Sequence, residues 1–185
     1  MRPFQRASRS AIVVALAGVG LLLPTAAAAE TPPLRLIDVV QVSWAGAPAA
    51  VATGDSVARV IQTDTIARWR NLSSDRIVFT FDAVLPSITT AAVMPCDAQG
   101  SVAYLNKVAL DAYTKAGITE WGNRYLVVIA PRVNTCVWAG RGLVNPPGST
   151  AGLLILNGTD DSFIIAHELG HNLGLGHSNL ETCTG

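Results

Sequence analysis

Three histidines and one glutamate near the end of the chain have a spacing that can hold a metal ion. His167 and His171 are four residues apart, so on an α-helix their Cβ atoms lie about 5–6 Å apart on one face. Glu168 directly follows the first histidine, which places its carboxylate beside such a metal and not on it. Gly174 favours the left-handed conformation that ends a helix, and the chain beyond it can bring in His177 from another side.

The chemistry that fits this set of side chains is that of a catalytic zinc site. Three neutral imidazoles leave one position of a tetrahedral Zn²⁺ open for water. Zinc lowers the pKa of such a water towards about 7, and Glu168 is placed to take its proton. We therefore predict one zinc ion bound by His167, His171 and His177, the only three histidines of the chain. The alternative is that these histidines only cap or pack a core helix.

The run H-E-L-G-H-N-L-G-L-G-H-S-N at residues 167–179 resembles the metzincin metallopeptidases, and most of all their gametolysin-like and reprolysin-like secreted branches. The resemblance implies a zinc endopeptidase with these three ligands and Glu168 as general base. Metzincins also carry a methionine-containing turn and a pocket wall after the third histidine. Here eight residues follow His177, and the methionines are Met1 and Met94. We therefore expect the C-terminal subdomain to be lacking.

Two classes of function follow from these observations. The first is a secreted zinc endopeptidase that hydrolyses peptide bonds in proteins through a zinc-bound water activated by Glu168. The second is a catalytically weak or inactive zinc-binding remnant, or a secreted binding module on a peptidase scaffold, because a site without its supporting subdomain binds metal or substrate less well. A site with a glutamate as third ligand is disfavoured, since Glu181 is the only acidic residue after His177.

The first 29 residues have the pattern of a secretory signal peptide. Three arginines precede an apolar run at residues 11–23 that is too short to span a bilayer, and Ala-Ala-Ala at 27–29 offers a cleavage site. The alternative is an uncleaved membrane anchor. We expect a secreted, extracellular protein of bacterial origin, in which residues 30–185 form one metallopeptidase catalytic domain, truncated at its C-terminus.

The charge of the chain excludes some partners. The whole sequence has 13 basic and 13 acidic residues, and removal of the three arginines in residues 1–29 leaves a formal net charge of −3. A balanced to slightly acidic chain does not favour nucleic acid or an anionic membrane surface. The expected partner is a protein or peptide substrate, and the sequence does not indicate the oligomeric state.

Hydrophobic periodicity predicts an α+β fold, in which a twisted mixed β-sheet carries long helices, including the zinc-binding helix. We expect strands at residues 34–44, 76–85, 124–130 and 152–156. A first helix is expected to begin at Asp55 or Ser56. A second is predicted over 97–116, with Val102 on its core face and Gly117 as its stop.

The predicted zinc-binding helix has an acidic start and an apolar body. Asp160 and Asp161 suit its N-terminus, where carboxylates meet the positive end of the helix dipole. Its residues, Phe163 among them, are apolar almost all round, so we expect it to run through the core. Gly170 in its interior costs about 1 kcal/mol relative to alanine, and we interpret it as permitting close packing against a neighbouring element.

A short segment between two buried strands is the candidate substrate-binding edge. In metzincins the strand in this place borders the cleft, and an extended substrate pairs with it. The resemblance therefore implies that Gly140, Arg141, Gly142 and Leu143 bind substrate. The alternative is an ordinary loop crossing.

The cysteine count is odd. Cys96, Cys136 and Cys183 fit an oxidising compartment with one disulfide and one remaining thiol, and the sequence does not choose among the three pairings. A separate hypothesis is that Cys96 acts as an inhibitory thiolate on the zinc, as pro-segment cysteines do in some metzincins.

Overall fold

The computed structural model describes residues 32–177. The predicted signal peptide and Cys183 lie outside these residues. Within them, no helix is both long and apolar enough to cross a membrane.

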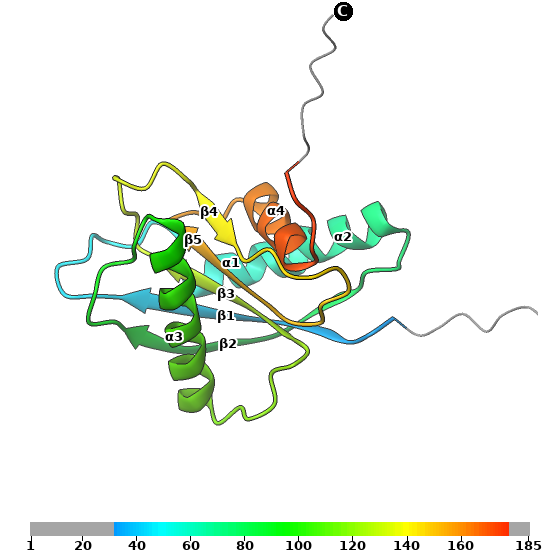
Figure 1. The fold of residues 1–185 in the computed structure, drawn as a ribbon, viewed down its shortest axis with the longest axis horizontal. Coiled ribbons are helices and arrows are strands. Elements are labelled where there is room, and N and C mark those ends of the chain that lie inside the picture. The colour runs from blue at the N-terminus through cyan, green and yellow to red at the C-terminus, as the bar shows by residue number, and fades with distance from the viewer. Residues whose placement is uncertain (1–31, 178–185) are drawn as a thin grey trace, which may run out of the picture. The chain divides into compact units, whose positions relative to one another are not determined.

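A five-stranded mixed sheet forms the centre of the described structure, in the order β2-β1-β3-β5-β4 (Figure 1). The four parallel strands are β1 (Arg35–Ser43), β2 (Phe79–Thr89), β3 (Arg124–Ala130) and β5 (Gly152–Asn157). The short strand β4 (Gly140–Gly142) pairs with β5 in the antiparallel direction and forms one edge. The predicted α+β class with a mixed sheet is thus confirmed.

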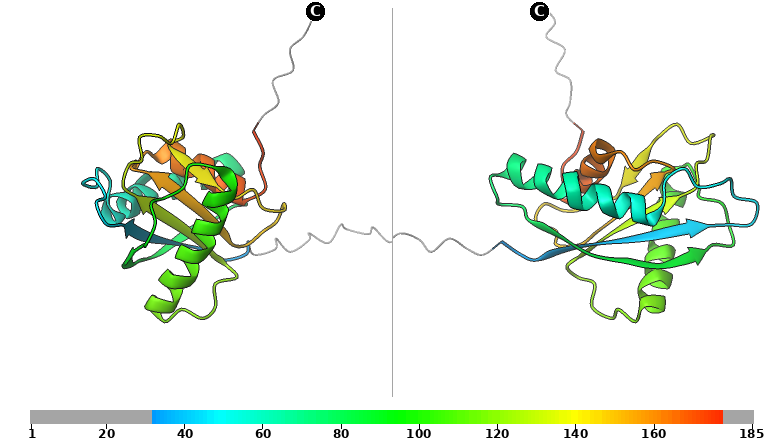
Figure 2. Two further views of the ribbon diagram at one scale, coloured as in Figure 1. Left: turned by 60° about the vertical axis from the view of Figure 1, so that its left-hand side comes forward. Right: turned by 180° about the vertical axis from the view of Figure 1, so that it is seen from behind.

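Helices cover both faces of the sheet. On one face, α1 (Gly54–Val60), the π-helical turn η1 (Ile61–Thr65) and α2 (Ile66–Ser73) follow one another without a break. The helix that carries the histidines, α4 (Ser162–Asn172), packs on the same face, and α3 (Ala98–Ala116) covers the other. Figure 2 shows α1 and α2 crossing the sheet on the side opposite to α3.

Side chains alternate between the two cores because successive residues of a strand point to opposite faces. The core on the α4 face contains Ile37, Val39, Tyr125, Val127, Leu154, Leu156, Ile165 and Leu169. The core on the α3 face contains Val40, Val42, Leu126, Val128, Ile155, Leu105, Val108 and Ala112. Since helices bury both faces, β3 and β5 are apolar apart from Arg124 at the start of β3 and Asn157 at the end of β5, and the sequence therefore predicts both strands clearly.

Element ends follow local capping chemistry. Asp161 accepts the main-chain N–H groups of Phe163 and Ile164, which confirms the predicted start of α4. Gly117 ends α3 with a φ of 69°, also as predicted. The first helix is different: Thr53, and not Asp55 or Ser56, is its N-cap, in a reciprocal pair with the Ser56 side chain.

Three further predictions are wrong in detail. Strand β2 begins at Phe79 and not at residue 76, because a turn with positive φ at Ser74 and Asp75 comes first. Val102 is 41% exposed, and Ser101 occupies the buried position of that turn of α3. Phe163 is 67% exposed, since α4 lies on the surface of its layer and the ring faces the Arg68 guanidinium at 4.0 Å.

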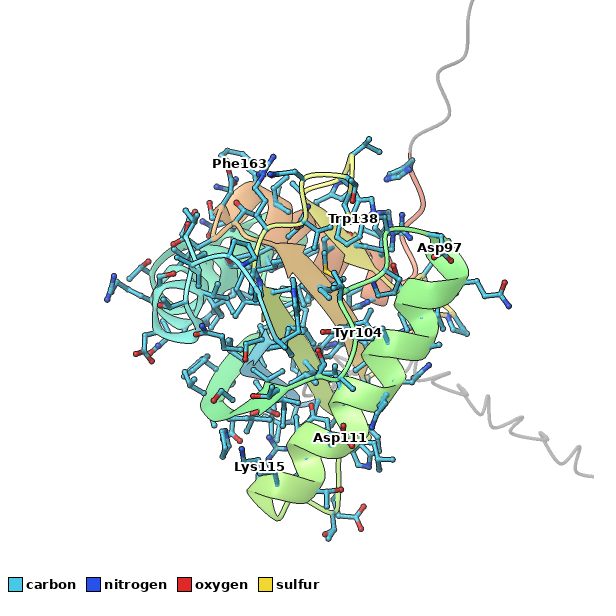
Figure 3. The ribbon with its side chains drawn as sticks, turned by 90° about the vertical axis from the view of Figure 1, so that its left-hand side faces the viewer. Asp97, Tyr104, Asp111, Lys115, Trp138 and Phe163 are labelled. Carbon is cyan, nitrogen blue, oxygen red and sulfur yellow. A yellow bond between two sulfur atoms is a disulfide. The ribbon has the colours of Figure 1, made fainter. Side chains whose placement is uncertain are left out.

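A disulfide joins Cys96, just before α3, to Cys136, just before β4. The hypothesis of an inhibitory Cys96 thiolate is therefore wrong, because that sulfur is bonded to another cysteine. Trp138 donates its indole N–H to the Cys96 carbonyl at 2.9 Å. Figure 3 shows Trp138 close to the Asp97 end of α3, so the loop before β4 is anchored on the α3 side of the sheet.

Candidate active site

Helix α4 and the turn that follows it bring the three histidines together. His167 and His171 lie on α4, with His171 buried and His167 exposed. Gly174 has a φ of 94°, and a Cβ there would stand 2.8 Å from the main-chain nitrogen of Pro147. The glycine is thus required both for the turn and for the close approach of a neighbouring loop, and the chain beyond it reaches His177.

The ring nitrogens of the three histidines converge. Nε2 of His177 lies 3.2 Å from Nε2 of His167 and 3.2 Å from Nε2 of His171. All three ligand nitrogens lie within 4.8 Å of one another. Around a tetrahedral Zn²⁺ with Zn–N distances of about 2.0–2.1 Å, ligand nitrogens stand roughly 3.3–3.4 Å apart. The donor set, and the spacing of the two nitrogen pairs that include His177, therefore fit a zinc ion.

The carbonyl oxygen of Leu175 determines which nitrogen of His171 is available. Nδ1 of His171 lies 2.7 Å from that oxygen. A carbonyl only accepts hydrogen bonds, so Nδ1 carries the proton and Nε2 keeps a free lone pair that points to the other histidines. The sequence does not indicate this role of Leu175, because every residue has a main-chain carbonyl and the residue type does not reveal which one accepts from His171.

Glu168 lies beneath the sheet edge. Its side chain is 6% exposed, and Oε2 accepts the main-chain N–H of Gly142 at 2.5 Å. Within residues 32–177, none of the salt bridges includes Glu168. A buried carboxylate without a cationic partner is costly in free energy. A metal cation at the adjacent histidines would reduce that cost.

Strand β4 exposes only part of its main chain at the sheet edge. The Leu143 N–H donates to Leu153, and the Asn157 N–H donates to Ala139, so residues 139, 141 and 143 face β5. The main-chain groups of Gly140 and Gly142 point outward. Of the four predicted substrate-binding residues, therefore, these two present their backbone to the edge.

The side chains of the other two predicted residues lie on the α3 face. Arg141 donates to the Ser101 hydroxyl at 3.2 Å, and its guanidinium lies 4.8 Å from the Trp138 ring centroid. Leu143 packs against the core of that face. The structure does not bring these two side chains to the histidines.

A cavity of about 280 Å³ borders the histidines between α2 and α4. Besides His167 and His171, its lining is largely apolar and includes Trp69, Leu72, Phe163 and Leu175. Residue patterns along the chain do not reveal this cavity, because its walls come from two helices that are distant in the sequence. Gly170 also lines it, and a Cβ there would meet Trp69 at an ordinary 3.5 Å. The predicted close packing at Gly170 is thus wrong.

The mixed sheet, the histidine-bearing helix and the convergent imidazoles together define a metallopeptidase-like domain. Residues 64–183, well over half of the 185 residues, match the family model described as gametolysin peptidase M11. The chain belongs to this family of metallopeptidases.

Two other comparisons add little. A search of curated proteins found no match. A solved structure described as "Structure of a chaperone-substrate complex" shares 20% sequence identity, with a TM-score of 0.38. The match covers 76% of this chain and 24% of that one, so the chain spans about a quarter of its length.

Proposed function

We propose that this protein is a secreted zinc endopeptidase of the metzincin type. His167, His171 and His177 bind one zinc ion, and Glu168 is the general base. The observation that carries the proposal is the convergence of three imidazole nitrogens, two pairs of them 3.2 Å apart, beside a buried carboxylate. Secretion is supported by the pattern of residues 1–29 and the chemistry by the donor set.

Each residue has a distinct part in this chemistry. Zinc, when bound, supplies a Lewis acid that polarises a carbonyl group and lowers the pKa of water. The Leu175 carbonyl keeps the proton of His171 on Nδ1, so that the lone pair of Nε2 would be free to bind the ion. Glu168 has one carboxylate oxygen held by Gly142, which leaves Oε1 to accept the proton of the attacking water and to pass it to the departing amine.

The substrate is expected to lie along β4. An extended peptide adds to a sheet edge through main-chain hydrogen bonds, and the Gly140 N–H and the carbonyl groups of Gly140 and Gly142 face outward for such pairing, whereas the Gly142 N–H is bonded to Glu168. Replacement of Leu143 by proline is a poor test of this role, because the Leu143 N–H is part of the β4–β5 ladder and its loss would damage the sheet itself.

The test combines metal content with hydrolysis. Purified protein is assayed for zinc per chain and for chelator-sensitive cleavage of casein, beside Glu168→Gln and the matched control Glu120→Gln, whose side chain is exposed. We expect one zinc in all three proteins and a loss of cleavage by about 10²- to 10⁴-fold in Glu168→Gln alone. Zinc without cleavage in the unmodified protein would instead indicate a non-catalytic zinc-binding domain.

A further inference from the structure

The carboxylate of Glu168 is held by the main chain of the sheet edge and not by a side chain. Oε2 accepts the Gly142 N–H at 2.5 Å, and this is the one hydrogen bond that Glu168 makes through its side chain within residues 32–177. The partners are 26 residues apart and belong to different layers of the fold. A single hydrogen-bond donor therefore determines the direction of this buried carboxylate.

Two glycines make this contact possible. A Cβ on Gly142 would overlap with the carbonyl oxygen of Glu168. A Cβ on Gly140 would stand 2.7 Å from Cγ2 of Ile164, 2.8 Å from Cγ of Glu168 and 3.0 Å from Oε1 of Glu168. Neither glycine has the positive φ that favours this residue elsewhere in the chain. Glycine is therefore needed here for the close approach of α4 and not for the backbone conformation.

The strand that holds the carboxylate is itself anchored on the opposite face of the sheet. The Cys96–Cys136 disulfide and the Trp138 hydrogen bond attach the preceding loop to the start of α3. The Arg141 side chain continues this attachment through the hydroxyl of Ser101. These contacts restrict the movement of β4, so the position of Gly142 relative to α4 is well determined.

We propose that β4 positions the general base: the Gly142 N–H orients Glu168, and the absence of a side chain at Gly140 and Gly142 gives the carboxylate its place. The inference rests on the proposed function, in which Glu168 accepts a proton. It also limits how a substrate pairs with this edge. The Gly142 N–H is occupied by Glu168, so an extended peptide uses the Gly140 N–H and the carbonyl groups of the two glycines.

The first experiment does not depend on activity. In the zinc-loaded protein, the Gly142 amide proton is followed by NMR. A short hydrogen bond to a carboxylate moves this resonance downfield. We expect Glu168→Gln to shift it upfield, whereas the matched variant Glu120→Gln leaves it unchanged. An unshifted Gly142 resonance in Glu168→Gln would overturn the proposal, whether or not the protein is a peptidase.

The second experiment measures the effect on catalysis. Gly140→Ala is expected to displace the carboxylate and to lower kcat by about 10- to 100-fold, since a misplacement of about 1 Å can cost that much. Zinc content and KM stay within about two-fold. Gly122→Ala, where a Cβ meets nothing within 4 Å, is the control and keeps full activity.

A double-mutant cycle separates positioning from a general structural effect. If Gly140→Ala acts through the base, it causes no further loss of the residual kcat in the Glu168→Gln background. An equal loss in both backgrounds, or an unchanged kcat in Gly140→Ala, would overturn the inference. Absence of cleavage in the unmodified zinc-loaded protein would overturn the proposed function instead, and the NMR result would still decide the contact.

Discussion

The two faces of the sheet bury charge in opposite ways. On the α3 face, Arg124 lies 2.7 Å from Asp38 and 2.8 Å from Asp82, so the acids have a cation. On the α4 face, Glu168 is buried with no ion pair among the described residues, and three imidazoles converge next to it. In the first cluster the protein itself supplies a cation to both acids. The second lacks a positive charge, which is the property of a site that binds a cation.

Burial is nevertheless costly even in the completed cluster. The side chain of Asp38 is fully buried, and this desolvation raises its pKa although Arg124 opposes the shift. An ion pair of this kind stabilises a fold less than its short distances suggest. Removal of either partner would, however, leave the other charge unpaired in an apolar environment, which is strongly unfavourable.

Removal of the metal from the histidines of the α4 face should have the largest effect on cleavage and on the melting temperature. We expect chelation to abolish cleavage and to lower the melting temperature, because a ligand present at about a thousand times its Kd stabilises the folded state by about 4 kcal/mol. Thermal unfolding is measured with zinc and with chelator. In His171→Ala, the difference in melting temperature between the two buffers should become much smaller. Equal melting temperatures of the unmodified protein in both buffers would contradict the expectation that the α4 face binds a cation.

Removal of the cation on the α3 face should affect stability and leave the chemistry intact. Arg124→Met leaves Asp38 buried without a partner, and such a change costs about 3–5 kcal/mol. Denaturant titration measures the free energy of unfolding. Below the transition, kcat per folded molecule is expected to remain unchanged. A kcat loss as large as that of Glu168→Gln would show that the two faces are not independent.

A smaller effect is expected at Gly170 of α4. A Cβ there meets Trp69 at 3.5 Å and Leu175 at 3.6 Å, which are ordinary contacts. Gly170→Ala should therefore stabilise the helix by up to about 1 kcal/mol, the difference in helix propensity. Thermal unfolding provides the measurement. Destabilisation by this variant would mean that α4 is tightly packed on its cavity side too, and not only against β4.

The smallest effect concerns the ionisation of tyrosines. Burial raises the pKa of Tyr104, Tyr113 and Tyr125, and at Tyr113 the charge of Asp38 adds to the shift. A raised pKa means that the folded protein binds the phenol proton more tightly than the unfolded chain does. The resulting contribution to the free energy of unfolding is fully present below about pH 10, and it is lost as the pH rises through the pKa values of the folded protein. Ultraviolet titration should show that tyrosinate forms at a higher pH in the folded protein than in the denatured protein.

The same titration tests the cluster of Asp38, Asp82 and Arg124 on the α3 face. Asp38→Asn removes the negative charge near Tyr113 and should lower the pKa of that tyrosine, leaving Tyr104 and Tyr125 unaffected. An unchanged titration curve would indicate that burial alone sets the value. This variant does not touch the α4 face, so cleavage serves as the internal control.

Local patterns were sufficient to predict much of this protein. The strand at residues 124–130 was predicted with its observed bounds, because a run of apolar residues buried on both faces needs no distant information. The ends of α3 at Asp97 and Gly117 were also predicted, since capping depends on a few neighbouring residues. The spacing of His167, His171 and His177 identified the candidate site for the same reason: four residues make about one helical turn.

Contacts between distant segments were decided only by the tertiary structure. The choice of Cys136 as the partner of Cys96 and the hydrogen bond from Gly142 to Glu168 depend on how strands and helices pack, which spacing along the chain does not encode. The exposure of Phe163 likewise depends on where α4 lies in its layer. The sequence by itself determined which side chains can do chemistry, whereas packing determined how the Glu168 carboxylate is held beside the three histidines.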